Sequence, residues 1–289
     1  MSGIRTDLAL EKHENHREES LPGVKIEKSG APHGQITRIE ITDKRSAEKL
    51  EKPVGVYYTF ETEGFPDAAA LSDGRRETVT GILRSLMPEQ GTVLVVGLGN
   101  PNITPDALGP RCAEQIFSTR HIDDETRKLL SLPPLREVCA ISPGVTGQTG
   151  VEAVEVIDGI CRKIAPEAVI AVDALAAGSV RRLARTVQIS NVGIEPGAGV
   201  GNARRALNRK TLGIPVIAVG VPTVVDALSL SRDVLSGGEL SEENSAYASM
   251  IVTPRETDTV IESAARMLAL AINCALQDKL SQEELLSLM

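Results

Sequence analysis

Histidine and aromatic residues are scarce in this sequence. Its 289 residues include four histidines and no tryptophan, and only 2% are aromatic. His13, His16 and His33 lie in the polar first part of the chain, which leaves His121 as the one histidine in its body. The chain also lacks a His-Glu-x-x-His zinc motif and a Gly-x-Ser-x-Gly nucleophile elbow. Any hydrolytic chemistry is therefore expected to depend on carboxylates.

Cysteine and long apolar runs are scarce as well. The four cysteines, Cys112, Cys139, Cys161 and Cys274, form no Cys-x-x-Cys pair, which is typical of free thiols in a reducing compartment. The first thirty residues carry no apolar signal-peptide segment, and no run approaches the roughly 18 apolar residues of a membrane-spanning helix. We therefore expect a soluble, cytoplasmic protein without a membrane partner.

Positive charge is in deficit. The net charge is −8 and the isoelectric point is about 5.2, so the chain has little attraction for phosphate and direct binding to nucleic acid is disfavoured. Hydrophobic residues make up 42% of the chain. With so few aromatics among them, the core must be built from Val, Ile, Leu and Ala. Such a core favours an α/β fold with buried, β-branched strands.

Apolar strand candidates alternate with helix candidates through most of the chain. This alternation predicts a mostly parallel, twisted sheet flanked by helices. The strand candidates are residues 91–97, 138–142, 168–172, 214–219 and, at an edge of the sheet, 186–190; the helix candidates are 66–87, 108–120, 151–164 and 255–279. Further strand candidates at 36–42 and 54–62 predict a small additional antiparallel sheet near the N-terminus. Residues 1–35 are expected to be exposed and mobile.

Polar side chains follow three of the buried strands. Asp106, Asp173 and Thr223 each lie in, or at the start of, the segment after such a strand. Because open α/β sheets place their sites at the carboxyl ends of the strands, we expect these residues to face one site.

Two glycine-rich segments belong to the same set of loops. The first begins Gly97-Leu-Gly-Asn100 and lacks the third glycine of a dinucleotide fingerprint, and the second, residues 197–201, lacks the Gly-Lys-Ser/Thr of a phosphate loop. Neither segment therefore predicts a nucleotide cofactor. We expect their backbone N–H groups to stabilise an oxyanion, and we expect a substrate channel to be lined by Gly97, Gly99, Asn100, Gly199, Gly201 and Thr223.

Asp106 and Asp173 form the sharper hypothesis. Two carboxylates close together in a low-dielectric site do not both ionise easily, so one keeps a proton while the other acts as a base toward water. That arrangement suits hydrolysis of an amide. The alternative is structural: Asp106 caps a helix that begins near Ala107, and Asp173 caps a helix in its own loop. The sequence leaves both interpretations open, and it does not decide which aspartate is the acid.

At these loops the sequence resembles the germination protease family. The resemblance covers nearly the whole chain and rests on long motifs. They are Val95–Asn100, Thr104–Pro110, Ser142–Gly147, Ala171–Ala177, Ile194–Asn202, Gly220–Ala227 and Val252–Glu256, together with Ile4–Ala9 near the start of the chain.

The resemblance implies an endopeptidase that begins the degradation of small acid-soluble spore proteins during germination. It implies a homotetrameric, self-processing zymogen located in the spore core, with Asp106 and Asp173 as the catalytic residues and no cofactor. The family cuts after an acidic residue that is followed by a hydrophobic residue and Ala. Arg204 and Arg205 are candidate partners for that acidic residue.

The order Asp7-Leu8-Ala9 fits this cleavage rule. We therefore predict self-processing between Asp7 and Leu8. Residues 1–7 would be the propeptide and 8–289 a single α/β protease domain, in which residues 8–90 supply the N-terminal strands and helix and residues 91–289 the catalytic core.

Two other functions remain open. The core also resembles the hydrogenase maturation proteases, which use the matching acidic positions to bind a metal. A metal-dependent, maturation-type peptidase is therefore one alternative, although the scarcity of histidine speaks against a zinc site. A non-enzymatic α/β binding module is the other.

Overall fold

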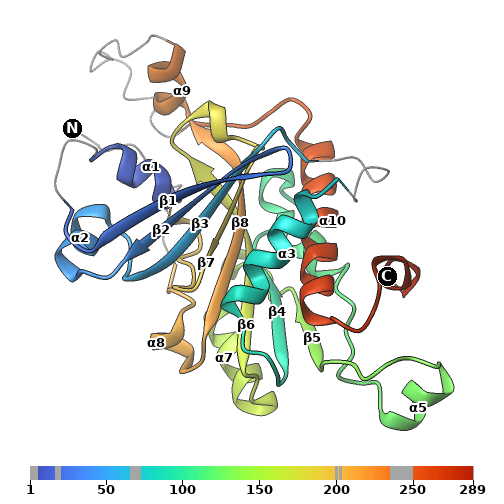
Figure 1. Ribbon diagram of the computed structural model, residues 1–289. Coiled ribbons are helices and arrows are strands. Elements are labelled where there is room, and N and C mark those ends of the chain that lie inside the picture. Colours follow the sequence, from blue (N-terminus) through green and yellow to red (C-terminus); the bar gives the residue numbers. More distant parts are fainter. Residues whose placement is uncertain are drawn as a thin grey trace.

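One twisted sheet runs through the whole molecule (Figure 1). The computed structural model describes residues 6–16, 21–65, 73–198, 201, 204–234 and 250–288. Within these residues, nine strands follow the order β1-β2-β3-β7-β8-β6-β4-β5, with β9 paired to β8. They are β1 (Val24–Ala31), β2 (Gly34–Ile41), β3 (Gly55–Thr62), β4 (Val93–Gly97), β5 (Val138–Ile141), β6 (Ala168–Ala177), β7 (Thr186–Ser190), β8 (Val216–Asp226) and β9 (Ile251–Val252).

The sheet has a parallel half and an antiparallel half. β8, β6, β4 and β5 run parallel to one another, whereas β1, β2, β3 and β7 pair antiparallel and β7 is antiparallel to β8. The predicted α/β fold is confirmed. The predicted antiparallel strands near the N-terminus are present, but they do not form a separate sheet. β3 pairs with β7, so residues 186–190 lie inside the sheet and not at its edge.

The start of the chain is more ordered than expected. Within residues 6–35, a short helix, α1 (Ala9–Glu14), precedes strand β1. Ala9 and Leu10 are only 2% and 3% exposed, because they pack against β2 and β3. Because most residues of this segment are polar, its composition gives no sign that Ala9 and Leu10 are buried. The expectation of an exposed segment is therefore wrong for residues 6–11, whereas most of residues 21–35 are exposed, as expected.

Helices α3, α4 and α10 cover one face of the sheet (Figure 1). α3 (Arg75–Leu86) and α4 (Leu108–Ala113) each turn an apolar side toward the strands, and α10 (Thr257–Leu276) packs against both helices. α4 is shorter than the predicted helix 108–120. Beyond its end, the backbone N–H of Phe117 donates to Asn273 Oδ1 of α10 at 3.0 Å.

Helix α10 is long and apolar enough to cross a membrane, judged by length and composition alone. Its most apolar 18-residue window has a mean hydropathy of 1.4, and 72% of that window is buried inside the protein. A helix that is apolar nearly all round is also what the core of a large domain requires. Here α10 fills that position, between α3 and α4.

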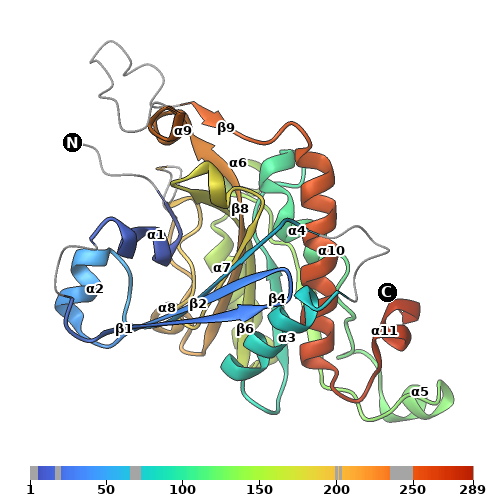
Figure 2. The same ribbon diagram turned by 45° about the horizontal axis from the view of Figure 1, so that its top comes forward.

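The opposite face is covered by α7 (Ala153–Ile164) and, over the N-terminal strands, by α1 and α2 (Lys44–Leu50). Alternating residues of each strand point to opposite faces, so Leu94 and Val96 contact α7 while Val93 and Val95 contact the α3–α10 layer. In Figure 2, α1 and α2 lie together at the far end of the sheet from α10. The remaining short helices are η2 (Thr104–Asp106), α5 (Asp124–Leu129), α6 (Thr146–Thr149), η3 (Val180–Arg182), α8 (Arg209–Leu212), α9 (Ala227–Val234) and α11 (Gln282–Leu288).

Candidate active site

Asp106 is held by the loop that leaves strand β4. Gly99 has φ +116°, and a Cβ there would lie 2.0 Å from the carbonyl oxygen of Asp106, so only glycine lets the two backbone segments approach. The backbone N–H of Asn100 donates to Asp106 Oδ2 at 2.7 Å. Burial raises the pKa of the Asp106 carboxyl, and the hydrogen bond from Asn100 partly opposes that rise.

The sequence suggested that Asp173 follows a strand. In the structure it lies within strand β6. β6 continues to Ala177, and the side chain of Asp173 is only 5% exposed. The backbone N–H of Ala174 donates to its Oδ1 at 2.9 Å. Burial raises the pKa of Asp173 well above its usual range, and the negative charges of Asp106 and Asp7 raise it further.

The two aspartates line the same cavity, which has a volume of about 600 Å³. Asn100 and Thr223 line it as well. The Thr223 hydroxyl, 1% exposed, donates to the carbonyl oxygen of Pro105 at 2.7 Å and so ties β8 to the turn that carries Asp106. Like charges in a shared, poorly solvated site favour one protonated and one ionised carboxyl, the combination that general acid–base chemistry needs.

Neither aspartate caps a helix. The residue that precedes α4 is Ala107, and it makes no side-chain capping bond, while Asp106 bonds to Asn100 instead. Asp173 is inside a strand, and its Oδ1 accepts a hydrogen bond from the N–H of Ala174 in the same strand. The helix-capping alternative for this pair is therefore wrong.

The glycines occupy different places around the cavity. Gly97 and Gly99 are not among the residues that line the cavity, contrary to the prediction, and Gly97 lies against the backbone of Gly109. Gly201 has φ +74° and its backbone N–H donates to the carbonyl oxygen of Ala198 in a tight turn. Gly199 lies outside the described residues.

Arg204 and Arg205 also line the cavity. Arg204 Nη1 lies 3.4 Å from Glu152 Oε1, so its charge is partly engaged by that carboxylate.

The predicted self-cleavage site is docked at the edge of this cavity. Strand β4 pairs with β6 only as far as Val172, which leaves the end of β6 free. Asp7 occupies that free edge: its N–H donates to the carbonyl oxygen of Ala176 at 3.0 Å, and the N–H of Ala176 donates to Asp7 Oδ2 at 2.8 Å. Leu8 is fully buried against Leu175 and Ala177.

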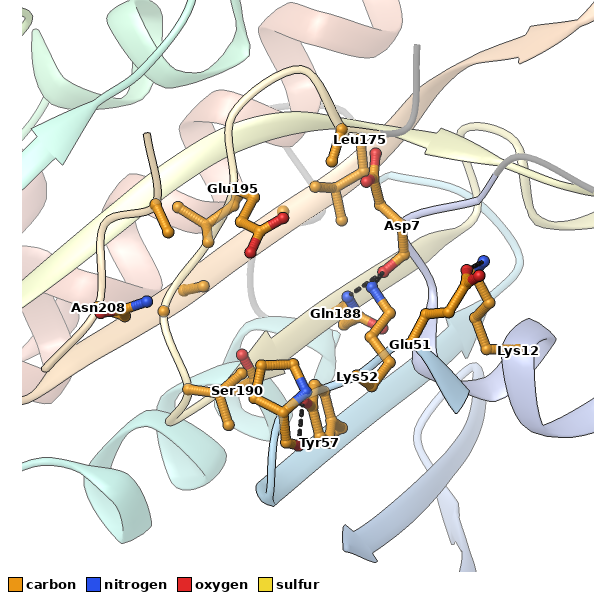
Figure 3. Close-up of a pocket in the computed structure, with 18 of the residues that line it drawn as sticks. Asp7, Lys12, Glu51, Lys52, Tyr57, Leu175, Gln188, Ser190, Glu195 and Asn208 are labelled. Carbon is orange, nitrogen blue, oxygen red and sulfur yellow. Dashed lines mark hydrogen bonds and ion pairs between the residues drawn. The ribbon is translucent and has the colours of Figure 1, made fainter. Parts of the chain in front are cut away.

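A second cavity, of about 410 Å³, lies on the other side of Asp7 (Figure 3). The carbonyl oxygen of Asp7 accepts hydrogen bonds there from Lys52 Nζ at 2.8 Å and from Gln188 Nε2 at 2.9 Å. In Figure 3 the Asp7 carboxylate points toward Leu175, away from these two donors. Sequence reasoning missed Lys52 and Gln188, because neither belongs to a motif with a chemical signature.

An ion-pair network holds the segment just after the cleavage site. Glu11 is 4% exposed, and it accepts a hydrogen bond from the N–H of Gly178 at 2.6 Å and one from the Thr6 hydroxyl. Arg182 bonds to Glu14 at 2.7 Å and to Glu61 at 2.9 Å, and lies 3.5 Å from Glu11. Burial raises the pKa of Glu11, and its hydrogen bonds and Arg182 oppose that rise.

The described residues contain no cluster of three or more His, Cys, Asp or Glu side chains that could hold a metal ion. Asp106 and Asp173 instead accept hydrogen bonds from backbone N–H groups of the chain itself.

Comparison with known proteins finds relatives that match nearly the whole chain. A family model described as Germination protease matches residues 5–237. The germination protease of Caldanaerobacter subterraneus subsp. tengcongensis is 40% identical, over 99% of this chain and 98% of the relative. That of Clostridium perfringens strain SM101 is 37% identical over the same shares of the two chains, and that of Geobacillus sp. strain WCH70 is 34% identical over 98% and 96%.

A structure search returns a [NiFe] hydrogenase maturation protease, HycI from Thermococcus kodakarensis. It is 17% identical, with a TM-score of 0.35, over 68% of this chain and 98% of that one. The family match and the relatives' near-complete coverage, in contrast, are decisive: the chain belongs to the germination protease family, a family of proteases.

Proposed function

We propose that this protein is an endopeptidase that starts the degradation of small acid-soluble spore proteins, and that it is made as a zymogen that cuts itself between Asp7 and Leu8. The observation that carries the proposal is the position of this peptide segment. It is hydrogen-bonded to the free edge of β6, next to the cavity that Asp106 and Asp173 line. An extended peptide added to a sheet edge is a common mode of substrate binding.

In the proposed mechanism, a water molecule attacks the carbonyl carbon of the peptide bond. Asp173 is the general acid, because burial and two neighbouring negative charges favour its protonated form. Asp106 is the general base, because it is less buried and the N–H of Asn100 stabilises its ionised form. The water gives one proton to Asp106, and Asp173 gives its proton to the departing amine.

The contacts of the docked segment support the cleavage rule. The N–H of Ala176 donates to the Asp7 carboxylate at 2.8 Å, a bond that an acidic side chain accepts more strongly than a neutral one. Leu8 fills an apolar site formed by Leu175 and Ala177. A preference for an acidic residue followed by a hydrophobic one is consistent with these two contacts. Arg204 and Arg205 add positive charge to the cavity wall.

Intact mass of the purified protein over time tests the proposal. We expect the wild type to lose residues 1–7, and we expect Asp106→Asn and Asp173→Asn each to stay intact and to leave a Glu-Leu-Ala peptide uncut. An Asp106→Asn or Asp173→Asn variant that processes normally would refute the aspartate pair. Activity that is lost on chelation and restored by a divalent metal would favour the metal-dependent alternative, and an inert wild type would favour a binding module.

The family membership also supports two proposals about the setting. We propose that the protein acts in the cytoplasm of the spore core and assembles as a homotetramer. Light scattering of the purified precursor measures the assembly directly, and a monomeric mass across the micromolar range would contradict it.

A further inference from the structure

The carbonyl group of the predicted cleavage site is held by two donors. Lys52 Nζ and Gln188 Nε2 lie 2.8 and 2.9 Å from the carbonyl oxygen of Asp7. Burial lowers the pKa of Lys52, and the negative charges of Asp7, Glu195 and Glu51 partly oppose that fall. Burying an ammonium group is costly unless it gains compensating partners. The hydrogen bond to the Asp7 carbonyl oxygen is one such partner, and it directs the ammonium group at this oxygen.

The sheet places Gln188 and Asp173 on the same face, two strands apart. Gln188, Gly220 and Asp173 are register partners across β7, β8 and β6, so the side chains of Gln188 and Asp173 lie on the same face. Neighbouring strands are about 4.8 Å apart, which puts the two Cα atoms about 10 Å from each other. Gly220 between them has no side chain, and a Cβ there would come within 2.5 Å of Leu175. The peptide segment thus lies in a space bounded by Gln188 on one side and β6 on the other.

Gln188 fixes the segment on both sides of Leu8. Its Nε2 donates to the Asp7 carbonyl oxygen, and its Oε1 accepts from the N–H of Ala9 at 2.7 Å. This is the one orientation of the amide that satisfies both contacts, since a carbonyl accepts and an N–H donates. The side chain substitutes for a backbone partner, and it fixes the direction in which the Asp7 carbonyl points.

We propose that Lys52 Nζ and Gln188 Nε2 form the oxyanion-stabilising site for cleavage of the Asp7–Leu8 bond. The inference rests on the proposed self-processing and deepens it. When water attacks, a carbon–oxygen bond forms and the carbonyl electron pair moves to the oxygen, where the ammonium and amide donors stabilise the new negative charge. The carbon–nitrogen bond then breaks, the electron pair returns, and the Leu8 nitrogen takes a proton from the general acid. Donors aimed at such an oxygen are often the largest single contribution to catalysis of acyl transfer.

The same contacts also permit an opposite role, in which they inhibit cleavage. The experiment distinguishes the two roles. Lys52 and Gln188 could hold the carbonyl in an unproductive direction and so restrain the zymogen. Removing the donors would then speed up self-processing, whereas the loss of an oxyanion site slows it.

The rate of loss of residues 1–7, followed by intact mass, is measured for wild type, Lys52→Met, Lys52→Arg and Gln188→Met. We expect Lys52→Met and Gln188→Met to slow processing by about 100-fold or more. Lys52→Arg keeps a positively charged donor, so it should process faster than Lys52→Met. If Lys52 served only to pack its aliphatic side chain, the charge of the replacement would make no such difference. Lys44→Met removes an exposed lysine from α2 and serves as the matched control. Thermal unfolding of each variant shows that it is folded.

Processing of folded Lys52→Met and Gln188→Met at the wild-type rate, or faster, would overturn this inference while leaving the proposed self-processing intact. An inert wild type, with no processing and no peptide cleavage, would overturn both. Slow Lys52→Met with partial recovery in Lys52→Arg supports the oxyanion site.

Discussion

Replacing Asp173 by asparagine should change the stability of the protein in a pH-dependent way. Its pKa lies well above 3.8 in the folded chain, chiefly because the carboxyl is buried. The folded state therefore holds the proton more tightly than the unfolded state does. The stability that this protonated carboxyl contributes is fully present below pH 3.8 and is lost as the pH rises through the folded-state pKa. Asparagine does not titrate and avoids this loss.

The magnitude follows from linkage. Between the two pKa values, wild-type Asp173 costs about 1.4 kcal/mol of unfolding free energy for each pH unit. The advantage of the asparagine variant should grow at up to that slope above pH 5 and level off beyond the folded-state pKa. The side chain is 5% exposed, so solvent screening reduces the effect little.

Urea unfolding followed by circular dichroism at pH 5, 6, 7 and 8 measures the effect. The two proteins compared are Asp106→Ala alone and Asp106→Ala combined with Asp173→Asn, so that neither cuts itself during the experiment. Burial and Asp7 still raise the pKa of Asp173 in this background. A difference in unfolding free energy between the two proteins that stays constant from pH 5 to pH 8 would refute a strongly raised pKa. It would also remove the argument for Asp173 as the general acid.

Three further changes test the docked segment and the loop. Leu8→Ala deletes a fully buried side chain, so we expect a loss of about 2–3 kcal/mol in docking and much slower self-processing by intact mass. Arg182→Gln leaves Glu11 buried without its cation, and urea unfolding at pH 7 should show a loss of about 3 kcal/mol. Gly99→Ala places a methyl group 2.0 Å from the Asp106 carbonyl at φ +116°, so peptide cleavage should fall steeply and thermal stability should drop.

Matched controls accompany these variants. Leu8→Met keeps an apolar side chain of similar volume and should process at nearly the wild-type rate. Arg181→Gln changes an exposed neighbour of Arg182 and should leave stability within about 0.5 kcal/mol. Gly159→Ala adds a methyl group to α7 where no heavy atom lies within 4 Å, and it should be neutral or slightly stabilising. If the controls behave like the test variants, the assigned contacts are not the cause.

Local pattern in the sequence determined the elements of the parallel half. Short, β-branched apolar runs predicted β4, β5, β6 and β8, because a strand that is buried on both faces needs apolar side chains on both faces. The proximity of Asp106 and Asp173 also followed from sequence. The parallel strands β4 and β6 are neighbours, so the loop after β4, which carries Asp106, begins beside the part of β6 that holds Asp173.

Only the tertiary structure decided how the start of the chain is used. Asp7 meets Lys52 and Gln188 because β3, β7 and β8 are neighbours in the sheet, an order that no local pattern encodes. The position of Asp173 inside β6 likewise depends on β8, which pairs with β6 beyond the point where β4 ends. Local periodicity specifies which face of an element is buried. The partners that a single lysine or glutamine meets across 45 or 181 residues depend on strand order and register, and these emerge only when the sheet assembles.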